Sequence, residues 1–186
     1  MATFETAYEE VKKLVIAFKE HDKTFLSPDY SEVRVRDDFI DDFIALGWNV
    51  THHGEKNPYR QEVKIEKSIT DKNKRKRRAD YAFSSAPNYD KTIFIVEAKK
   101  PARDLLNADD YLQAIRYATN TNTPIVVLTD FEEFHIVDAR FQTTIDTALR
   151  RKIRQYRYQD YADREKFAEI YYLFSREAVA DNSIQE

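Results

Sequence analysis

Apolar side chains recur at helical spacing near the start of the chain and again after residue 31. Between residues 4 and 20 they lie three or four positions apart, which predicts an amphipathic helix. A second helix is expected to begin at Ser31, a good N-cap residue, and to end at Gly47, a residue type favoured just past a helix end. The apolar stripe of this second helix is extended by a carboxylate, because Glu32 lies three residues before Val35.

The middle of the chain has the pattern of strands. Apolar and polar residues alternate from Val63 to Ile69, and the later apolar runs are short and bounded by turn residues or proline. Residues from about 107 to 119 have helical periodicity. The expected later strands cover residues 79–83, 92–99, 124–130 and 134–139, the last of them returning from its predecessor as a hairpin.

Strands that alternate with helices, together with two hairpins, predict an α/β fold with a central mixed β-sheet flanked by helices. Residues 143–180 are highly charged and read as helical, with an aromatic stripe that we interpret as core or as an inter-domain face (Phe167, Tyr171 and Phe174). We therefore expect one domain over residues 1–142, and a helical extension or linker over residues 143–186.

Composition excludes several classes of protein. The 186 residues include only two glycines, Gly47 and Gly54, so no glycine-rich dinucleotide turn or phosphate loop can be written. With no cysteine, thiolate metal sites, iron–sulfur clusters and a cysteine nucleophile are also excluded. No apolar run is long enough to cross a bilayer, and the acidic start MATFETAYEE lacks the features of a secretion signal. A cytoplasmic protein that does not enter membranes is expected.

Three charged residues are expected to meet at the end of the apolar strand TIFIVEAK. Glu97 and Lys99 are two residues apart, so they project from the same face of a strand. If the strand containing Asp80 pairs with this one as an antiparallel hairpin, and Asp80 faces Glu97, the turn falls between Asn88 and Tyr89, where turn residues cluster. Directly opposed residues share a face, so Asp80, Glu97 and Lys99 would converge.

This combination of residues suits phosphodiester hydrolysis. Two close carboxylates repel unless a cation neutralises them, and Mg²⁺ is typically held by one or two carboxylates while it keeps waters and phosphate oxygens as its other ligands. The ammonium of Lys99 cannot be a ligand, but it can hold or activate an attacking water and stabilise charge on a phosphate. The alternative interpretation of Asp80, Glu97 and Lys99 is an exposed cross-strand ion-pair face.

Asp80, a spacer of sixteen residues and then Glu97-Ala98-Lys99 resemble the PD-(D/E)xK nuclease superfamily. The segment SEVRVRDDFIDDFIALGW looks like the first helix of the nuclease domain in type I restriction subunits, where a helical glutamate faces the metal; this role falls on Glu32. Gln113 and Tyr117 are similar to the Q-x-x-x-Y element of those domains, and KFAEIYYLFSREAV (residues 166–179) looks like the linker after the nuclease domain in type IIG enzymes.

The resemblance implies a restriction-endonuclease-like fold and a Mg²⁺-dependent endodeoxyribonuclease domain of a restriction–modification enzyme, with Mn²⁺ as a substitute cofactor. It implies Asp80, Glu97 and Glu32 as metal ligands, and Asp80, Glu97, Lys99, Glu32 and Gln113 as the catalytic set. The substrate would be double-stranded DNA, cut to leave 5′-phosphate and 3′-hydroxyl ends. A dimer on DNA would allow cleavage of both strands.

The sequence also departs from that pattern. Ala79 stands where the superfamily commonly has proline, a difference that does not touch the chemistry. No ATPase phosphate loop and no N-P-P-[YF] methyltransferase motif is present, so translocation, methylation and sequence recognition would have to come from methyltransferase, specificity or translocase domains downstream. Two other functions stay open: a catalytically inactive nucleic-acid-binding or scaffold module of the same fold, and a repair or junction nuclease.

Basic residues are concentrated in two places although the formal net charge is −3. The run from Lys72 to Arg78 could track DNA phosphates, or it could be a solvated loop. Its expected DNA contacts are Lys74, Arg75, Lys76, Arg77 and Arg78. A second cluster is expected to place Arg150, Arg151 and Arg154 on one helical face. The histidines His52, His53 and His135 lack metal-ligand spacing and are interpreted as loop or strand residues.

Overall fold

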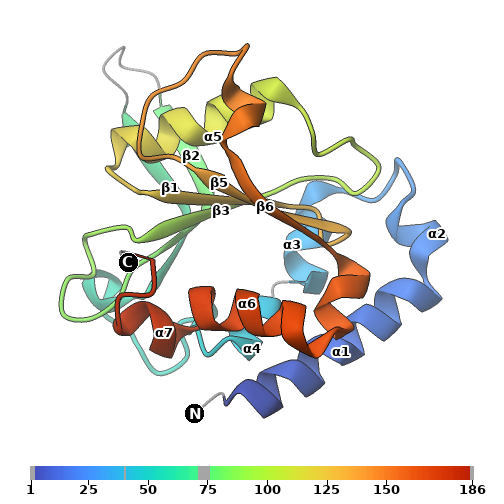
Figure 1. Cartoon of the computed structure of the whole chain (residues 1–186). Coiled ribbons are helices and arrows are strands. Elements are labelled where there is room, and N and C mark those ends of the chain that lie inside the picture. Colours follow the sequence, from blue (N-terminus) through green and yellow to red (C-terminus); the bar gives the residue numbers. More distant parts are fainter. Residues whose placement is uncertain (1–2, 40, 71–75, 185–186) are drawn as a thin grey trace.

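A six-stranded mixed β-sheet forms the centre of the protein, in a computed structural model that describes residues 3–39, 41–70 and 76–184 (Figure 1). The strands lie in the order in which they follow along the chain. Neighbouring strands are antiparallel, except that β3 and β4 are parallel. The strands are β1 (Val63–Thr70), β2 (Lys76–Phe83), β3 (Phe94–Ala98), β4 (Ile125–Thr129), β5 (Glu133–Asp138) and β6 (Lys152–Arg157).

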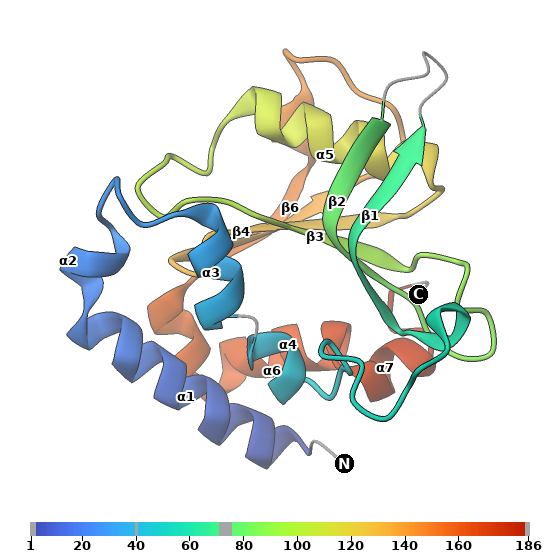
Figure 2. The same ribbon diagram turned by 180° about the vertical axis from the view of Figure 1, so that it is seen from behind.

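Helices cover both faces of the sheet, as Figures 1 and 2 show. One face lies against α5 (Ala108–Asn120), and the other lies against a helical layer that comprises α1, α4, α6 and α7. The helices of the second side are α1 (Phe4–Glu20), α2 (Asp22–Phe25), α3 (Glu32–Phe39), α4 (Asp41–Ala45), α6 (Arg164–Phe174) and α7 (Arg176–Ala180). The short 3-10 turns are η1 (Pro58–Arg60), η2 (Ala148–Arg151) and η3 (Tyr158–Ala162). The mixed sheet flanked by helices confirms the expected fold class.

The two faces of the sheet carry separate hydrophobic clusters because alternate strand residues point to opposite sides. On β3, Phe94 and Val96 pack with residues of α1, α4 and α6, whereas Ile95 packs with the apolar face of α5. All five residues of β3 are buried. Glu97 follows the alternation of Ile95, so its carboxylate belongs to the α5 side of the sheet.

The helices begin largely where the sequence predicts. Residues 4–20 form α1, and Asn107 caps α5 by accepting from the N–H groups of Asp109 and Asp110. Ser31 accepts from the N–H of Arg34 at 3.2 Å, which is the expected capping contact. The helix expected over residues 31–47 corresponds to α3 and α4, which lie on either side of residue 40, a position outside the described residues. Gly47, at φ +92°, ends this region in the left-handed conformation that glycine adopts readily.

The C-terminal region differs from the expected charged helix. Residues 152–157 form β6, which pairs with β5, so Arg154 lies on a strand and does not share a helical face with Arg150 and Arg151. Alternation along β6 is weak, since only Tyr156 is buried, and charge at other positions obscured the strand signal. The aromatic stripe of α6 is buried in the core, as one of the two interpretations held.

The expected division into a domain over residues 1–142 and an extension over residues 143–186 stays a prediction. In the structure, β6 and α6 belong to the same sheet and the same hydrophobic core as the elements before residue 142. The indole N–H of Trp48 donates to the carbonyl of Phe174 at 2.8 Å, and the N–H of Arg176 donates to the carbonyl of Leu46 at 3.0 Å. Among the described residues, no helix combines the length and the apolar character needed to cross a membrane.

Candidate active site

The hairpin of β2 and β3 has the register that the sequence predicts. Tyr81 pairs with Val96 and Phe83 pairs with Phe94, the register in which Asp80 faces Glu97. The ladder ends at this point, because the N–H of Ala98 donates to Oδ2 of Asp80 at 2.8 Å. The carboxylate of Asp80 therefore takes the place of a strand-to-strand bond, at the position where β2 and β3 part.

Glu97 and Lys99 lie beside this carboxylate at the end of β3. The parallel pairing with β4 continues past Ala98, because the N–H of Lys99 donates to the carbonyl of Thr129 at 2.8 Å. Nζ of Lys99 is 3.9 Å from Oε2 of Glu97, and both side chains are largely buried. A rigid strand therefore holds the acid and the base together. We call Asp80, Glu97 and Lys99 the carboxylate site.

The two carboxylates of the site influence each other electrostatically. Burial raises the pKa of Glu97 to about 8, the charge of Asp80 is the next cause, and Lys99 opposes the shift. Glu97 is only 7% exposed, so its ionised form is poorly solvated. Burial and the charge of Asp80 both favour the protonated form of Glu97 when no cation is bound.

Glu32 reaches the same cluster from the first turn of α3, which lies beside the end of β3 (Figure 2). Burial raises the pKa of Glu32, Lys99 lowers it, and Asp80 adds to the increase. Those two influences place the carboxyl group of Glu32 near the carboxylate site, where the sequence analysis expects it. Its role in metal binding or catalysis stays a prediction.

Gln113 and Tyr117 lie one turn apart on α5, above the same face of β3. Tyr117 is buried, and its pKa is raised to about 12 by burial and then by Glu97, while a hydrogen bond with the backbone of Ala79 opposes the shift. The side chain of Gln113 is exposed. Of the two, it is therefore Tyr117 that the structure connects with Glu97, and the catalytic role of Gln113 stays a prediction.

Sequence reasoning missed two groups at the site. Nη1 of Arg36 lies 3.1 Å from Oδ1 of Asp80, and its Nη2 lies 3.5 Å from Oε1 of Glu66. Asp110, at the start of α5, contributes to the raised pKa values of both Glu32 and Glu97. Helical spacing places Arg36 four residues after Glu32 and Asp110 three residues before Gln113, but it does not show which of these side chains face the sheet.

The residues present fit a hard divalent cation of the Mg²⁺ type through two carboxylates. Asp80 and Glu97 are neighbouring oxygen donors, and the raised pKa of buried Glu97 means that added positive charge beside it would be favourable. Within the described residues, no three His, Asp or Glu side chains are arranged to hold a metal ion. The role of Glu32 as a third metal ligand stays a prediction.

Most of the expected DNA contacts in the basic run cannot be placed. Lys74 and Arg75 lie outside the described residues, and so do the side chains of Lys76 and Arg77. The side chain of Arg78 is exposed, with Nη1 3.3 Å from Oε2 of Glu66. Glu66 thus lies between Arg78 and Arg36, so a chain of ion pairs joins the basic run to Asp80.

The histidines occupy structural positions, as the sequence analysis interprets them. Nε2 of His52 is 2.7 Å from the carbonyl of Val63 in a loop. His135 is fully buried on β5, where its Nδ1 is 2.6 Å from the hydroxyl of Tyr111 and its Nε2 is 2.9 Å from Oε2 of Glu133. The contacts of His135 tie α5 to β5 across the sheet face.

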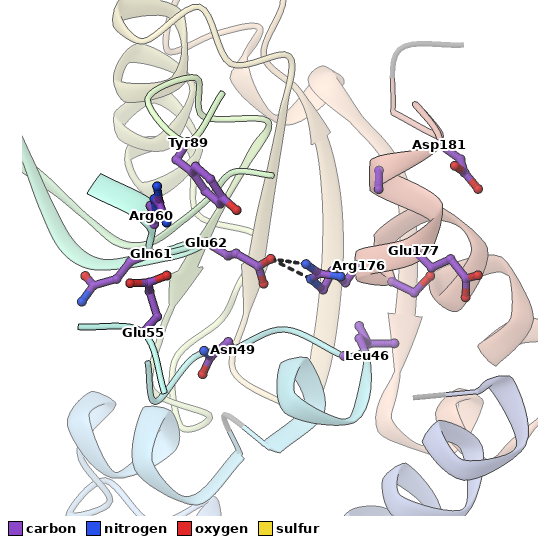
Figure 3. A pocket seen from close by; sticks show the side chains of 13 residues that line it. Leu46, Asn49, Glu55, Arg60, Gln61, Glu62, Tyr89, Arg176, Glu177 and Asp181 are labelled. Carbon is purple, nitrogen blue, oxygen red and sulfur yellow. Dashed lines mark hydrogen bonds and ion pairs between the residues drawn. The ribbon is translucent and has the colours of Figure 1, made fainter. Parts of the chain in front are cut away.

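A cleft of roughly 640 Å³ lies away from the carboxylate site, at the loop end of the β2–β3 hairpin (Figure 3). Its centre is the ion pair between Glu62 and Arg176, whose Nε is 2.7 Å from Oε1 of Glu62. Acidic side chains outnumber basic ones around it, because Glu55, Glu177 and Asp181 add to Glu62. That charge balance does not suit a phosphate backbone.

Comparison with known proteins gives one family and one relative. The sequence matches the family model described as MmeI, N-terminal domain, over residues 13–180. It is 30% identical over 175 residues to the Type II restriction enzyme and methyltransferase RM.Eco57I of Escherichia coli, an alignment that covers 92% of this chain and 17% of the relative. The chain thus spans a small part of that protein's length. No solved structure matches.

Proposed function

The chain belongs to the MmeI N-terminal domain family, and on this premise we propose that it is a Mg²⁺-dependent endodeoxyribonuclease domain of a restriction–modification enzyme. The observation that carries the proposal is the convergence of Asp80, Glu97 and Lys99 at the place where β2 and the buried strand β3 part. The match to RM.Eco57I, whose name describes a restriction enzyme and methyltransferase, supports the restriction setting. The likeness to the PD-(D/E)xK superfamily is part of the proposal.

Each residue of the site has a distinct task in this proposal. Asp80 and Glu97 would hold Mg²⁺ or Mn²⁺, and the bound cation would supply positive charge for the attacking water and the phosphate oxygens. Lys99 directly follows β3 and its N–H donates to the carbonyl of Thr129, so its ammonium would position or activate the water and stabilise charge that grows on the phosphate. Glu32 and Gln113 support the site from α3 and α5. The substrate is double-stranded DNA, and hydrolysis leaves 5′-phosphate and 3′-hydroxyl ends.

The remaining partners follow from the restriction setting. Methylation and sequence recognition would come from linked methyltransferase and specificity domains or, in a type I setting, translocase domains. Such an enzyme would work in the cytoplasm. A second copy would be needed on DNA if both strands are cut, because each chain carries one carboxylate site.

The direct test is plasmid nicking by the 186-residue chain with Mg²⁺ or Mn²⁺ and with EDTA. We expect nicking only with the cation, and a loss of about 10²-fold or more in Lys99→Ala and in Asp80→Asn. The Asn variant keeps an oxygen for the N–H of Ala98, so the end of the hairpin is preserved. Lys100→Ala is the matched control, because Lys100 is exposed and adjacent in sequence. Undiminished nicking by Lys99→Ala would refute the assignment.

One observation favours a second candidate, a nucleic-acid-binding module without catalysis. Both oxygens of Asp80 already have partners, Oδ1 in Arg36 and Oδ2 in the N–H of Ala98. Salt-sensitive DNA binding without cleavage under Mg²⁺ or Mn²⁺ would support this candidate. A repair or junction nuclease would instead prefer flaps or four-way junctions over linear duplex.

A further inference from the structure

Arg36 is the basic group in closest contact with the carboxylate site. Its side chain is 14% exposed, and its guanidinium lies between Oδ1 of Asp80, at 3.1 Å, and Oε1 of Glu66, at 3.5 Å. Arg36 is one helical turn after Glu32 on α3, so the same helix brings an acid and a base to the site. Neither the sequence pattern nor the family resemblance gives Arg36 a role.

Arg36 acts as a counter-ion of Asp80, and a bound divalent cation would take over that role. The Arg36 guanidinium supplies positive charge at one oxygen of Asp80, in the way that a divalent cation would. A divalent cation and a guanidinium repel each other at this range. Binding of a cation by Asp80 and Glu97 would therefore weaken the attraction that holds Arg36 in place.

Release of Arg36 would not leave Glu66 without a cation. Oε2 of Glu66 is already 3.3 Å from Nη1 of Arg78, an exposed residue of the basic run. The guanidinium of Arg36 carries five N–H donors in a planar fork that matches the oxygens of a phosphate group. Once Arg36 leaves Asp80, its N–H groups could donate to a phosphate group at the edge of the site.

We propose that Arg36 is the counter-ion of Asp80 in the cation-free protein, and that it moves to a DNA phosphate oxygen when Asp80 binds a divalent cation. This inference rests on the proposed function, because it takes Asp80 as a cation ligand and DNA as the substrate. It assigns to Arg36 both competition with the cation and cation-dependent contact with DNA. No covalent step is involved, since only ion pairs and hydrogen bonds are exchanged.

The first test is Mn²⁺ binding by the full chain without DNA, measured by the loss of the free-ion paramagnetic resonance signal. We expect Arg36→Gln to bind Mn²⁺ about three- to tenfold more tightly than the wild type, because a competing positive charge is removed. Arg36→Lys keeps that charge and should stay within about twofold of the wild type. Arg34→Gln is the matched control, since Arg34 is exposed on the same helix. Unchanged or weaker Mn²⁺ binding in folded Arg36→Gln would overturn the competition.

The second test is the affinity for a labelled duplex, measured by fluorescence anisotropy in Ca²⁺ and in EDTA. In Ca²⁺, Arg36→Gln should bind the duplex about five- to twentyfold more weakly than the wild type, because a charged phosphate contact is lost. In EDTA the two should agree within about twofold, since Arg36 is then engaged by Asp80. An equal loss in both conditions would indicate a fixed contact or a structural defect, and no loss in Ca²⁺ would exclude the move to phosphate. Either result overturns the proposal.

These readouts separate the inference from the nuclease proposal. If Arg36→Gln differs from the wild type in Mn²⁺ and in Ca²⁺ as expected above, but the wild type does not nick plasmid, the nuclease proposal fails. Arg36 still exchanges partners on cation binding in that case. If the wild type nicks plasmid but Arg36→Gln shows neither pattern, the inference about Arg36 fails alone. If Mn²⁺ does not bind to the wild type, both fail.

Discussion

Replacing Glu97 by Gln should make the cation-free protein more stable at alkaline pH. Glu97 is 7% exposed, and burial, followed by the charge of Asp80, raises its pKa from 4.5 to about 8. In the unfolded chain the carboxyl group ionises near its ordinary pKa, so the native state binds more protons than the unfolded state between these two values. The stability of the wild type should therefore fall as the pH rises from 4.5 to 8, and level off above that range.

The size of the effect follows from the pKa difference. Each pKa unit corresponds to about 1.4 kcal/mol, so the difference amounts to roughly 5 kcal/mol if the side chain stays buried, and less if it rotates toward water. Glutamine has nearly the same shape and cannot ionise. We expect Glu97→Gln to be about 2–5 kcal/mol more stable than the wild type at pH 9, with a much smaller difference at pH 4.5.

Urea unfolding followed by circular dichroism, in EDTA and at several pH values, measures this difference. Mn²⁺ should also raise the stability of the wild type at pH 9, and should raise that of Glu97→Gln less, because one ligand is weakened. A constant difference between the two proteins from pH 4.5 to 9 would refute the reasoning, since a packing effect does not titrate. Lys100→Ala serves again as the exposed control.

Three further variants test other parts of the fold. Burial raises the pKa of Asp130 to about 7, so Asp130→Asn should gain about 2–4 kcal/mol relative to the wild type above pH 8 but little near pH 4, in the same urea assay. Arg176→Met leaves the carboxylate of Glu62 without its cation and should cost about 1–3 kcal/mol in urea unfolding, whereas Lys13→Met breaks an exposed pair and should cost less than about 0.5 kcal/mol. Equal losses would contradict this contrast. Trp48→Phe removes the hydrogen bond to the end of α6 and should lower the unfolding free energy by about 1–2 kcal/mol, and an unchanged midpoint would mean that this bond contributes nothing net.

Much of the fold could be predicted because local patterns and tertiary packing agree. The apolar run of β3 and the turn residues after Phe83 together fixed a hairpin register, and the structure has that register. Capping residues such as Ser31 and Asn107 marked helix starts for the same reason. Strand β6 was missed because it is defined mainly by its pairing with β5 and not by the pattern of its own side chains. Five of its six side chains are at least partly exposed, so periodicity says little.

The carboxylate site was predictable in part. Asp80, Glu97 and Lys99 could be grouped because two strands and one turn determine their relative positions. Arg36 and Asp110 escaped notice because their importance depends on how α3 and α5 pack against the sheet, and one sequence does not determine those angles. The bond from the N–H of Ala98 to Asp80 could not be foreseen either, since a regular ladder would give that N–H a backbone partner.

The return of the chain to its own sheet after residue 142 has a consequence for transplanting this domain into another protein. The ring of Phe174 lies 5.1 Å from that of Phe94 and 5.7 Å from that of Phe134, so α6 completes the core beneath the strand that bears Glu97. A graft that stopped before β6 would leave β5 as an open edge and those rings bare to water. The smallest unit that could be transplanted would therefore have to reach through α7, and hybrid proteins joined earlier should aggregate on expression.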